Sequence, residues 1–91
     1  MGSDYSIKEV VYPADLTMCY GTWSTDGGTD TVKLNLRRHA RMQQVLHCAV
    51  QYLGDTPLDS EPSVKTLPID GSELEIIVQA NSSGLFAAIG L

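Results

Sequence analysis

The sequence predicts an all-β fold, a small antiparallel β-sandwich or barrel of six to seven strands that forms a single domain over residues 1–91. Short runs rich in β-branched and aromatic residues recur along the chain, and several alternate with the period of two typical of strands. Clusters of Gly, Pro, Asp and Asn separate these runs at regular intervals. A length of 91 residues with 43% hydrophobic residues suits one globular domain with a modest core.

The first two expected strands are separated by a proline. Residues 6–12 (SIKEVVY) end at Pro13, which has no N–H to donate to a strand ladder. The second run covers residues 16–24 (LTMCYGTWS). In a strand its side chains alternate between two faces, with Met18, Tyr20 and Thr22 on one and Cys19, Gly21 and Trp23 on the other.

The segment DGGTD, residues 26–30, could be a phosphate cradle, a cation site or a turn. A phosphate loop requires a following helix and a Lys-Ser or Lys-Thr pair, and an EF-hand loop requires alternate oxygen donors with a late glutamate. The sequence has neither pattern here. We therefore expect a hairpin turn in which Gly27 and Gly28 supply positive φ angles and Asp26 accepts a backbone hydrogen bond.

The strand after this turn, residues 31–36, alternates cleanly, whereas residues 40–54 are ambiguous. The apolar residues of the second segment make an acceptable helical face, formed by Met42, Val45, Leu46, Ala49, Val50 and Leu53. The same segment also alternates as a strand would, with Leu46, Cys48, Val50 and Tyr52 opposite His47, Ala49 and Gln51. No Ser, Thr, Asp or Asn cap precedes it, so we expect a strand over residues 45–52, with one short helix around residues 40–53 as the alternative.

The second half contains a polar loop followed by further strands. Residues 54–62 (GDTPLDSEP) form a loop by composition, and a short run at residues 63–67 leads to Pro68. After this, Asp70 and Gly71 form a second turn.

A strand after that turn points Leu74, Ile76 and Val78 inward. Ile77 falls on the opposite face, so we expect a second sheet or another subunit to cover this strand on both sides. The chain closes with a polar turn and an apolar run at residues 81–91, which we expect to be docked in a sheet.

The charge balance disfavours nucleic acid as the main partner. The formal net charge is −5, whereas duplex binding requires a concentrated positive surface. The segment RRHAR, residues 37–41, is a local exception with three of the six Lys and Arg residues. In so acidic a chain, a solvated corner or a salt-bridge patch between subunits is favoured over a DNA contact. The sequence has no apolar run of membrane-spanning length, and we expect a soluble protein that is not exported.

No constellation of residues predicts an enzyme. A nucleophile would be sought among Cys19, Cys48 and the serines, and a base among His39 and His47. His47 and Cys48 are adjacent, so a strand sends their side chains to opposite faces and they cannot form a dyad. The sequence therefore predicts no catalytic residue, no cofactor site and no metal site.

Two further pairs of residues are candidates for chemistry. Glu73 and Glu75 would lie about 7 Å apart on one strand face, which suits an inverting glycosidase, but a solvated face that discourages edge pairing is the simpler interpretation. Cys19 and Cys48 could form a disulfide, yet each lies in an apolar run where a free thiol behaves as a small buried hydrophobe.

Two stretches together carry a family resemblance, LTMCYGTWSTDGGTDTVKLNL (residues 16–36) and DGSELEIIVQANSSGLFAAIGL (residues 70–91). Their layout of strand, Gly/Asp turn and strand, ending in Ser/Gly and a short apolar strand, resembles small virion proteins of tailed bacteriophages, particularly head decoration (cement) proteins. The resemblance implies a homo-oligomer, with a trimer favoured, that binds the major capsid protein lattice in the virion after synthesis in the host cytoplasm. The long loop at residues 54–62 departs from this layout.

Two other functions remain open at this point. The acidic loop could mimic nucleic acid and block a host protein, which would make the chain a small binding module. A small-ligand-binding β-barrel is the third possibility. For a decoration subunit, we expect contacts through apolar residues on both strand faces, including Ile77, and through the apolar chain end.

Overall fold

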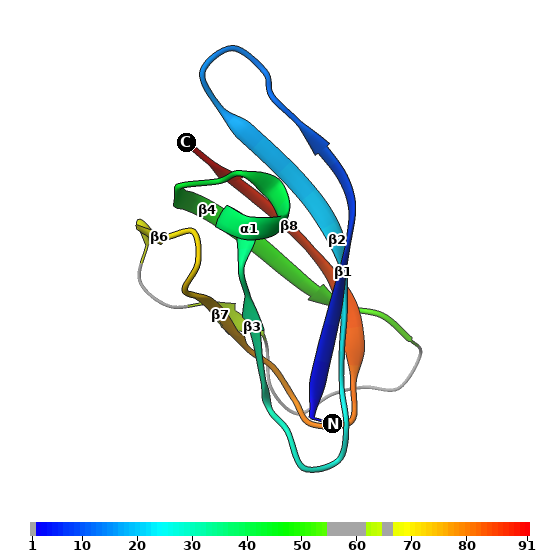
Figure 1. The fold of residues 1–91 in the computed structure, drawn as a ribbon. Helices are drawn as coiled ribbons and strands as arrows, with labels where there is room; N and C mark the ends of the chain where they lie inside the picture. Colours follow the sequence, from blue (N-terminus) through cyan, green and yellow to red (C-terminus); the bar gives the residue numbers. More distant parts are fainter. Residues whose placement is uncertain (1, 55–61, 65–66) are drawn as a thin grey trace.

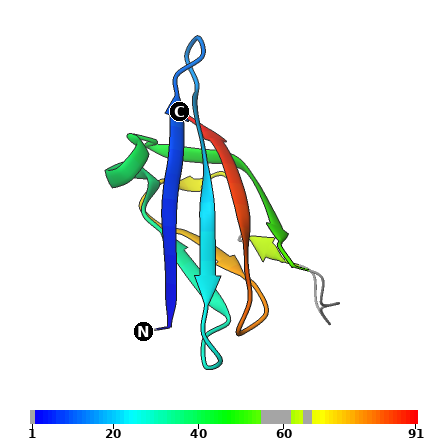
Figure 2. The ribbon, with the colours of Figure 1, turned by 90° about the vertical axis from the view of Figure 1, so that its right-hand side faces the viewer.

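The computed structural model describes residues 2–54, 62–64 and 67–91, and they form two antiparallel sheets packed face to face (Figures 1 and 2). The first sheet has the order β1 (Ser3–Val11), β2 (Thr17–Thr25), β8 (Ser83–Gly90), β4 (Gln44–Tyr52) and β6 (Ile69–Asp70). The second has the order β3 (Thr31–Leu34), β7 (Leu74–Ile77) and β5 (Ser63–Val64). In Figure 2, β1, β2 and β8 lie side by side in front of β3 and β7. The all-β antiparallel sandwich expected from the sequence is confirmed.

Eight strands are described, rather than six to seven, because β5 and β6 are two-residue strands that carry little sequence signal. The loop expected at residues 54–62 falls, apart from its two ends, outside the described residues. Residues 65–66 of the expected run at 63–67 also lie outside them.

The core lies between the two sheets and is filled by large side chains. The five-stranded sheet contributes Cys19, Trp23, Val45, Cys48, Phe86 and Ala88, and the three-stranded sheet contributes Val32, Leu34, Leu74 and Ile76. The alternation in β2 fixes its buried face, because Cys19, Gly21 and Trp23 are buried while Met18 and Tyr20 are exposed. The apolar carboxyl-terminal run is docked as expected, and as β8 it lies at the centre of the five-stranded sheet.

The ambiguous segment is a strand, and the helix lies elsewhere. Residues 44–52 form β4, so a helix around residues 40–53 is wrong. The one helix among the described residues is α1 (Leu36–Ala40), whose first turn is capped by the Asn35 side chain accepting the N–H of Arg38 at 3.0 Å. Leu36 and Ala40, four residues apart, bury the same side of this helix against the core.

A bulge in β4 changes which of its side chains are buried. The register with β8 shifts between Val45 and His47, so Leu46 stands as the extra residue and is 39% exposed. The expected alternation placed Leu46 on the same face as Cys48, and it is wrong at this position. Beyond the bulge the expectation holds, since His47 is exposed and Cys48 is buried.

The DGGTD segment is a turn, but it is not a hairpin turn. It carries the chain from β2 in one sheet to β3 in the other, so the two strands do not pair. Neither Gly27 nor Gly28 has a positive φ angle, because a crossing between sheets does not require the twist of a hairpin turn. The carboxylate of Asp26 does accept the N–H of Gly28, at 3.0 Å, as expected.

The second sheet leaves one apolar side chain in the open. The strand β7 buries Leu74 and Ile76, whereas Ile77 is 45% exposed. Within the described part of the chain, β7 is therefore covered on one side, by the five-stranded sheet. The expected second cover over Ile77 would have to come from elsewhere.

Candidate interaction surface

The outer face of the five-stranded sheet is the surface on which apolar side chains are exposed together. Because β1, β2, β8 and β4 are neighbours, their outward side chains form rows across the sheet. The first row contains Val11, Met18, Ile89 and His47, and the second contains Glu9, Tyr20, Ala87 and Ala49. We call these two rows the apolar end of the face. Val11, Met18 and Tyr20 are 44%, 37% and 49% exposed.

The same face becomes polar towards the other end of the strands. The third row contains Ser6, Thr22, Leu85 and Gln51, and the fourth contains Asp4, Ser24 and Ser83. We call these rows the hydroxyl end. The face is thus graded along the strand direction, with large apolar side chains at one end and short hydroxyls at the other.

The apolar end is not flat. A hollow of about 410 Å³ lies over it, lined in part by Met18, Tyr20, His47, Ala49 and Ala87. A smaller hollow of about 200 Å³ also borders Tyr20, Ala49 and Ala87. Tyr20 on β2 therefore stands as a ridge beside a trough that the two alanines leave over β8 and β4.

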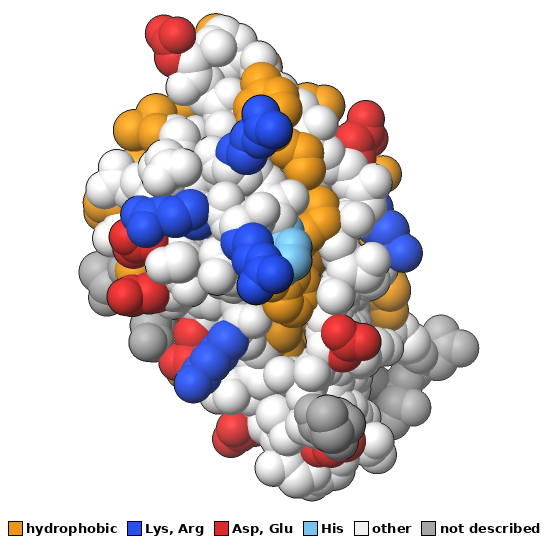
Figure 3. Space-filling model, viewed as in Figure 1, with side chains coloured by type: hydrophobic (Ala, Val, Ile, Leu, Met, Phe, Trp, Pro, Cys, Tyr) orange, Lys and Arg blue, Asp and Glu red, His pale blue; other side chains and the backbone are white. Residues whose placement is uncertain are grey.

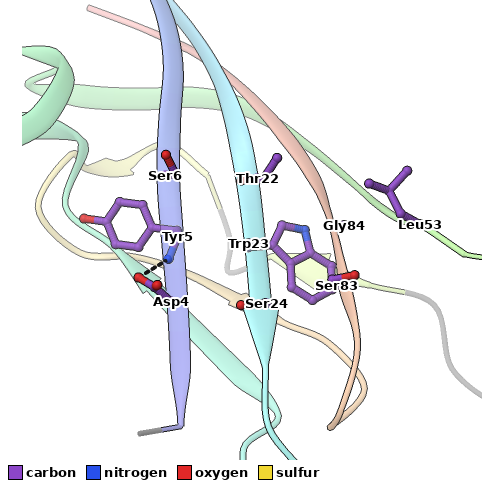
Figure 4. Close-up of a pocket in the computed structure, with 9 residues that line it drawn as sticks. All are labelled: Asp4, Tyr5, Ser6, Thr22, Trp23, Ser24, Leu53, Ser83 and Gly84. Atoms are coloured by element: carbon purple, nitrogen blue, oxygen red, sulfur yellow. Dashed lines mark hydrogen bonds between the residues drawn. The ribbon is translucent and has the colours of Figure 1, made fainter.

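The hydroxyl end carries a shallow hollow of about 340 Å³, shown in Figure 4. The Asp4 carboxylate is engaged within its own strand, where it accepts the N–H of Tyr5 at 2.8 Å. Trp23 lines this hollow but is only 2% exposed, and its indole N–H donates to the carbonyl of Leu85 at 3.1 Å. The Tyr5 ring, which also lines the hollow, packs against His39, and its hydroxyl accepts the N–H of Asn35. Both rings are thus engaged within the chain, and these residues alone do not define a ligand class.

The two cysteines are buried free thiols on the core side of the sheet. Cys19 on β2 and Cys48 on β4 both lie opposite Ala88 of the strand between them. Two strand spacings put their Cα atoms about 10 Å apart, beyond the roughly 7 Å that a disulfide can span. Burial raises the pKa of the Cys19 thiol, and burial followed by the neighbouring Cys19 raises the pKa of Cys48 to about 12.

The two histidines lie on different elements. His39 on α1 packs edge-on against the Tyr5 ring, with 5.8 Å between ring centroids. His47 on β4 lines the hollow over the apolar end, and its neighbour Cys48 points into the core. The described residues hold no group of three or more His, Cys, Asp or Glu side chains that could bind a metal ion.

The basic segment 37–41 forms α1 and its end. The Arg37 side chain donates to the Asp70 carboxylate at 2.6 Å. One cation of the basic segment is therefore paired within the chain rather than between subunits. Figure 3 shows Lys and Arg side chains over α1 and β3 with Asp and Glu side chains among them. This mixture of charges agrees with the solvated corner expected from the sequence.

Two aspartates on turns have lowered pKa values. The carboxylate of Asp70 accepts the side-chain O–H and the backbone N–H of Ser72, and these bonds, followed by Arg37, lower its pKa. Asp26 accepts the N–H groups of Gly28 and Gly2, and these bonds lower its pKa. The Asp26 carboxylate therefore links Gly2, just before β1, to the turn that joins the two sheets.

Glu73 and Glu75 lie at the start of β7. Glu75 on β7 lies opposite Lys33 on β3, and Glu73 is exposed in the turn before β7. The exposure of Glu73 agrees with the solvated face that the sequence favoured, whereas Glu75 is half-buried. Among the described residues no helix is long and apolar enough to cross a membrane.

Comparison with protein-family models, with curated proteins and with solved structures gives no match for this chain. The surface described above is therefore the basis for a functional proposal. Sequence reasoning had placed Met18 and Tyr20 on one face of their strand, but it did not identify that face as exposed. The alternation of Ala87 and Ile89 with Phe86 and Ala88 was the signal that the final strand also has an apolar outer side.

Proposed function

We propose that the protein is a structural subunit of a bacteriophage virion, a capsid decoration (cement) protein that stabilises the head lattice through oligomeric contacts. The observation that carries this proposal is the apolar end of the outer sheet face. There a β-branched, a thioether and an aromatic side chain, Val11, Met18 and Tyr20, are exposed together on adjacent strands. A contiguous exposed apolar patch of this kind is typical of a protein–protein interaction site.

The form of this surface favours assembly over binding of a small molecule. Between the strands that the structure describes, the core is filled, with Trp23 and Phe86 each 2% exposed, which disfavours a barrel lumen for a ligand. Shallow apolar surfaces suit many identical weak contacts, which together give high avidity on a lattice. The host-inhibitor alternative depends on the acidic loop, whose residues 55–61 lie outside the described part of the chain.

The test adds purified protein to phage heads that lack decoration subunits. We expect many copies to bind per head and the temperature at which heads disrupt to rise, because cement subunits bury surface across capsomer boundaries. Met18→Ser on the outer face should reduce the number of bound copies, because it weakens the oligomeric contacts. Leu53→Ser at the hydroxyl end of the sheet, a matched loss of an exposed apolar side chain away from the apolar end, serves as its control.

Binding of many copies with an unchanged disruption temperature would contradict the cement role. An absence of binding at saturating concentration would contradict the virion role as a whole.

A further inference from the structure

We propose that a second copy of this chain covers the outer face of the five-stranded sheet, in a two-fold, sheet-to-sheet dimer whose axis runs parallel to the strands. The inference deepens the proposed function, on which it rests only for the need to self-associate. It names both the occupant of the face and the geometry of the contact. Four features of the face select this arrangement.

The gradient along the strands selects the direction of the axis. A two-fold axis parallel to the strands keeps every row at its own level, so the apolar end of one copy meets the apolar end of the other. An axis across the strands would lay the row of Tyr20 over the hydroxyl of Thr22 and the row of Met18 over the hydroxyl of Ser24, and would desolvate both hydroxyls. Aligned packing of two sheets is also a common way for sheets to meet.

The ridge and the trough of the apolar end fit those of a second copy related by that axis. The four long strands lie in the order β1-β2-β8-β4, so an axis along their midline runs between β2 and β8 and places β2 of one copy over β8 of the other. Tyr20 of each copy then faces Ala87 of its partner, and the Tyr20 ridge enters the trough beside Ala49. Large side chains against small ones allow the two faces to interdigitate.

The polar groups at the edges of the apolar end are also complementary. The same axis places β1 of one copy over β4 of the other. Glu9 therefore lies above the level of Ala49, one row from His47. This arrangement allows the imidazole N–H of His47 to donate to the partner's Glu9 carboxylate, and the symmetry makes this contact twice.

The size of the face suits a weak dimer. Four strands spaced about 4.8 Å apart and four rows spaced about 6.8 Å apart cover roughly 500 Å² per copy. Two copies bury about 1,000 Å², the size at which specific interfaces begin. We therefore expect self-association that depends on protein concentration.

The experiment exchanges ridge and trough and measures solution mass by light scattering over a range of concentrations. Ala87→Tyr alone sets tyrosine against tyrosine and should weaken self-association at least about tenfold. The double variant Tyr20→Ala with Ala87→Tyr moves the ridge to β8, where it again faces an alanine of the partner, and should restore the dimer. Ile77→Tyr on the other sheet is the matched control and should leave the mass unchanged.

Circular dichroism of each variant confirms that it is folded, so that a loss of mass reports on the interface. Restoration by the double variant supports the two-fold pairing, since an unrelated partner would have no reason to accept the exchange. A wild-type protein that stays monomeric at all concentrations, or a dimer that Ala87→Tyr leaves intact, would overturn it.

The same measurement separates this inference from the proposed function. A stable trimer would overturn the two-fold pairing, while binding to undecorated heads would still support a cement role. Conversely, the double variant could restore the dimer while the protein does not bind heads. That result would support the two-fold pairing and contradict the proposed function.

Discussion

At the scale of single residues, Trp23 shows how closely the core is packed. Its ring is 2% exposed and meets Tyr52 edge-on, with 5.7 Å between ring centroids. On the neighbouring strand, Gly84 leaves the space that the indole occupies, because a Cβ there would lie 2.6 Å from the ring. The glycine is thus required by its close approach to the ring and to the backbone of the next strand rather than by an unusual backbone angle.

Substitution of Gly84 by alanine tests this packing. The new Cβ would also approach the carbonyl oxygen of Gln51 to 2.0 Å, so strand or ring must shift. We expect the free energy of unfolding to fall by about 1–3 kcal/mol, the usual cost of overpacking. Denaturant unfolding followed by fluorescence of the single tryptophan measures it. Gly27→Ala is the control, because its Cβ would have no neighbour within 4 Å, and an unchanged stability in Gly84→Ala would refute the argument.

The carboxylate of Asp70 should make stability depend on pH in a defined direction. Hydrogen bonds from Ser72, followed by Arg37, lower its folded-state pKa below the usual 3.8. In the window between the two values the unfolded chain binds more protons, so the stabilisation is present above pH 3.8 and is lost as pH falls through the folded-state pKa.

Asp70→Asn should therefore lower the melting temperature near neutral pH, and its difference from the wild type should shrink towards pH 2. Thermal unfolding across this range, with Asp15→Asn in the exposed loop between β1 and β2 as the charge-matched control, measures the effect. Identical pH profiles for the two variants would mean that the hydrogen bonds of Asp70 do not stabilise the fold.

At the scale of elements, α1 ends at a residue whose conformation does not suit its side chain. Arg41 has φ 57° and ψ 27°, in the left-handed region, while its N–H donates to the carbonyl of Leu36. Residues other than glycine pay roughly 1 kcal/mol or more for this conformation. The end of the helix is therefore fixed by the tertiary path of the chain into β4 rather than by a glycine.

Arg41→Gly should raise the free energy of unfolding by about 0.5–1 kcal/mol, because the relief of strain exceeds the added entropy of the unfolded chain. Chemical denaturation measures the change. Arg38→Gly, inside the same helix, is the control and should destabilise by about 1 kcal/mol. A loss of stability in Arg41→Gly would show that the arginine side chain contributes more than its backbone costs.

At the scale of the whole molecule, the two thiols report on global unfolding. Cys19 and Cys48 are buried on the central strands, and burial raises the pKa of both, so neither forms the reactive thiolate at neutral pH. We expect a thiol reagent at pH 8 to modify neither in the folded protein and both in denaturant. Labelling of one cysteine without denaturant would reveal local opening of its strand, which the pairing of both cysteines with Ala88 of β8 argues against.

The sequence by itself determined the fold class and most of the strands. The alternation in β2, β7 and β8 is local information, because the side-chain period of a strand is set by its own backbone. Prolines and Asp/Gly pairs mark the strand ends for the same local reason. The strand over residues 45–52 was found in this way, within one residue of β4.

Only the tertiary structure decided which strands share a sheet and which faces remain open. The DGGTD turn looked like a hairpin because its local chemistry does not encode whether the next strand pairs or crosses to the other sheet. The Leu46 bulge, the separation of Cys19 from Cys48 by β8 and the exposed row of Met18 and Tyr20 depend on pairings between distant segments. These pairings follow from packing the whole chain at once, and no single segment contains them.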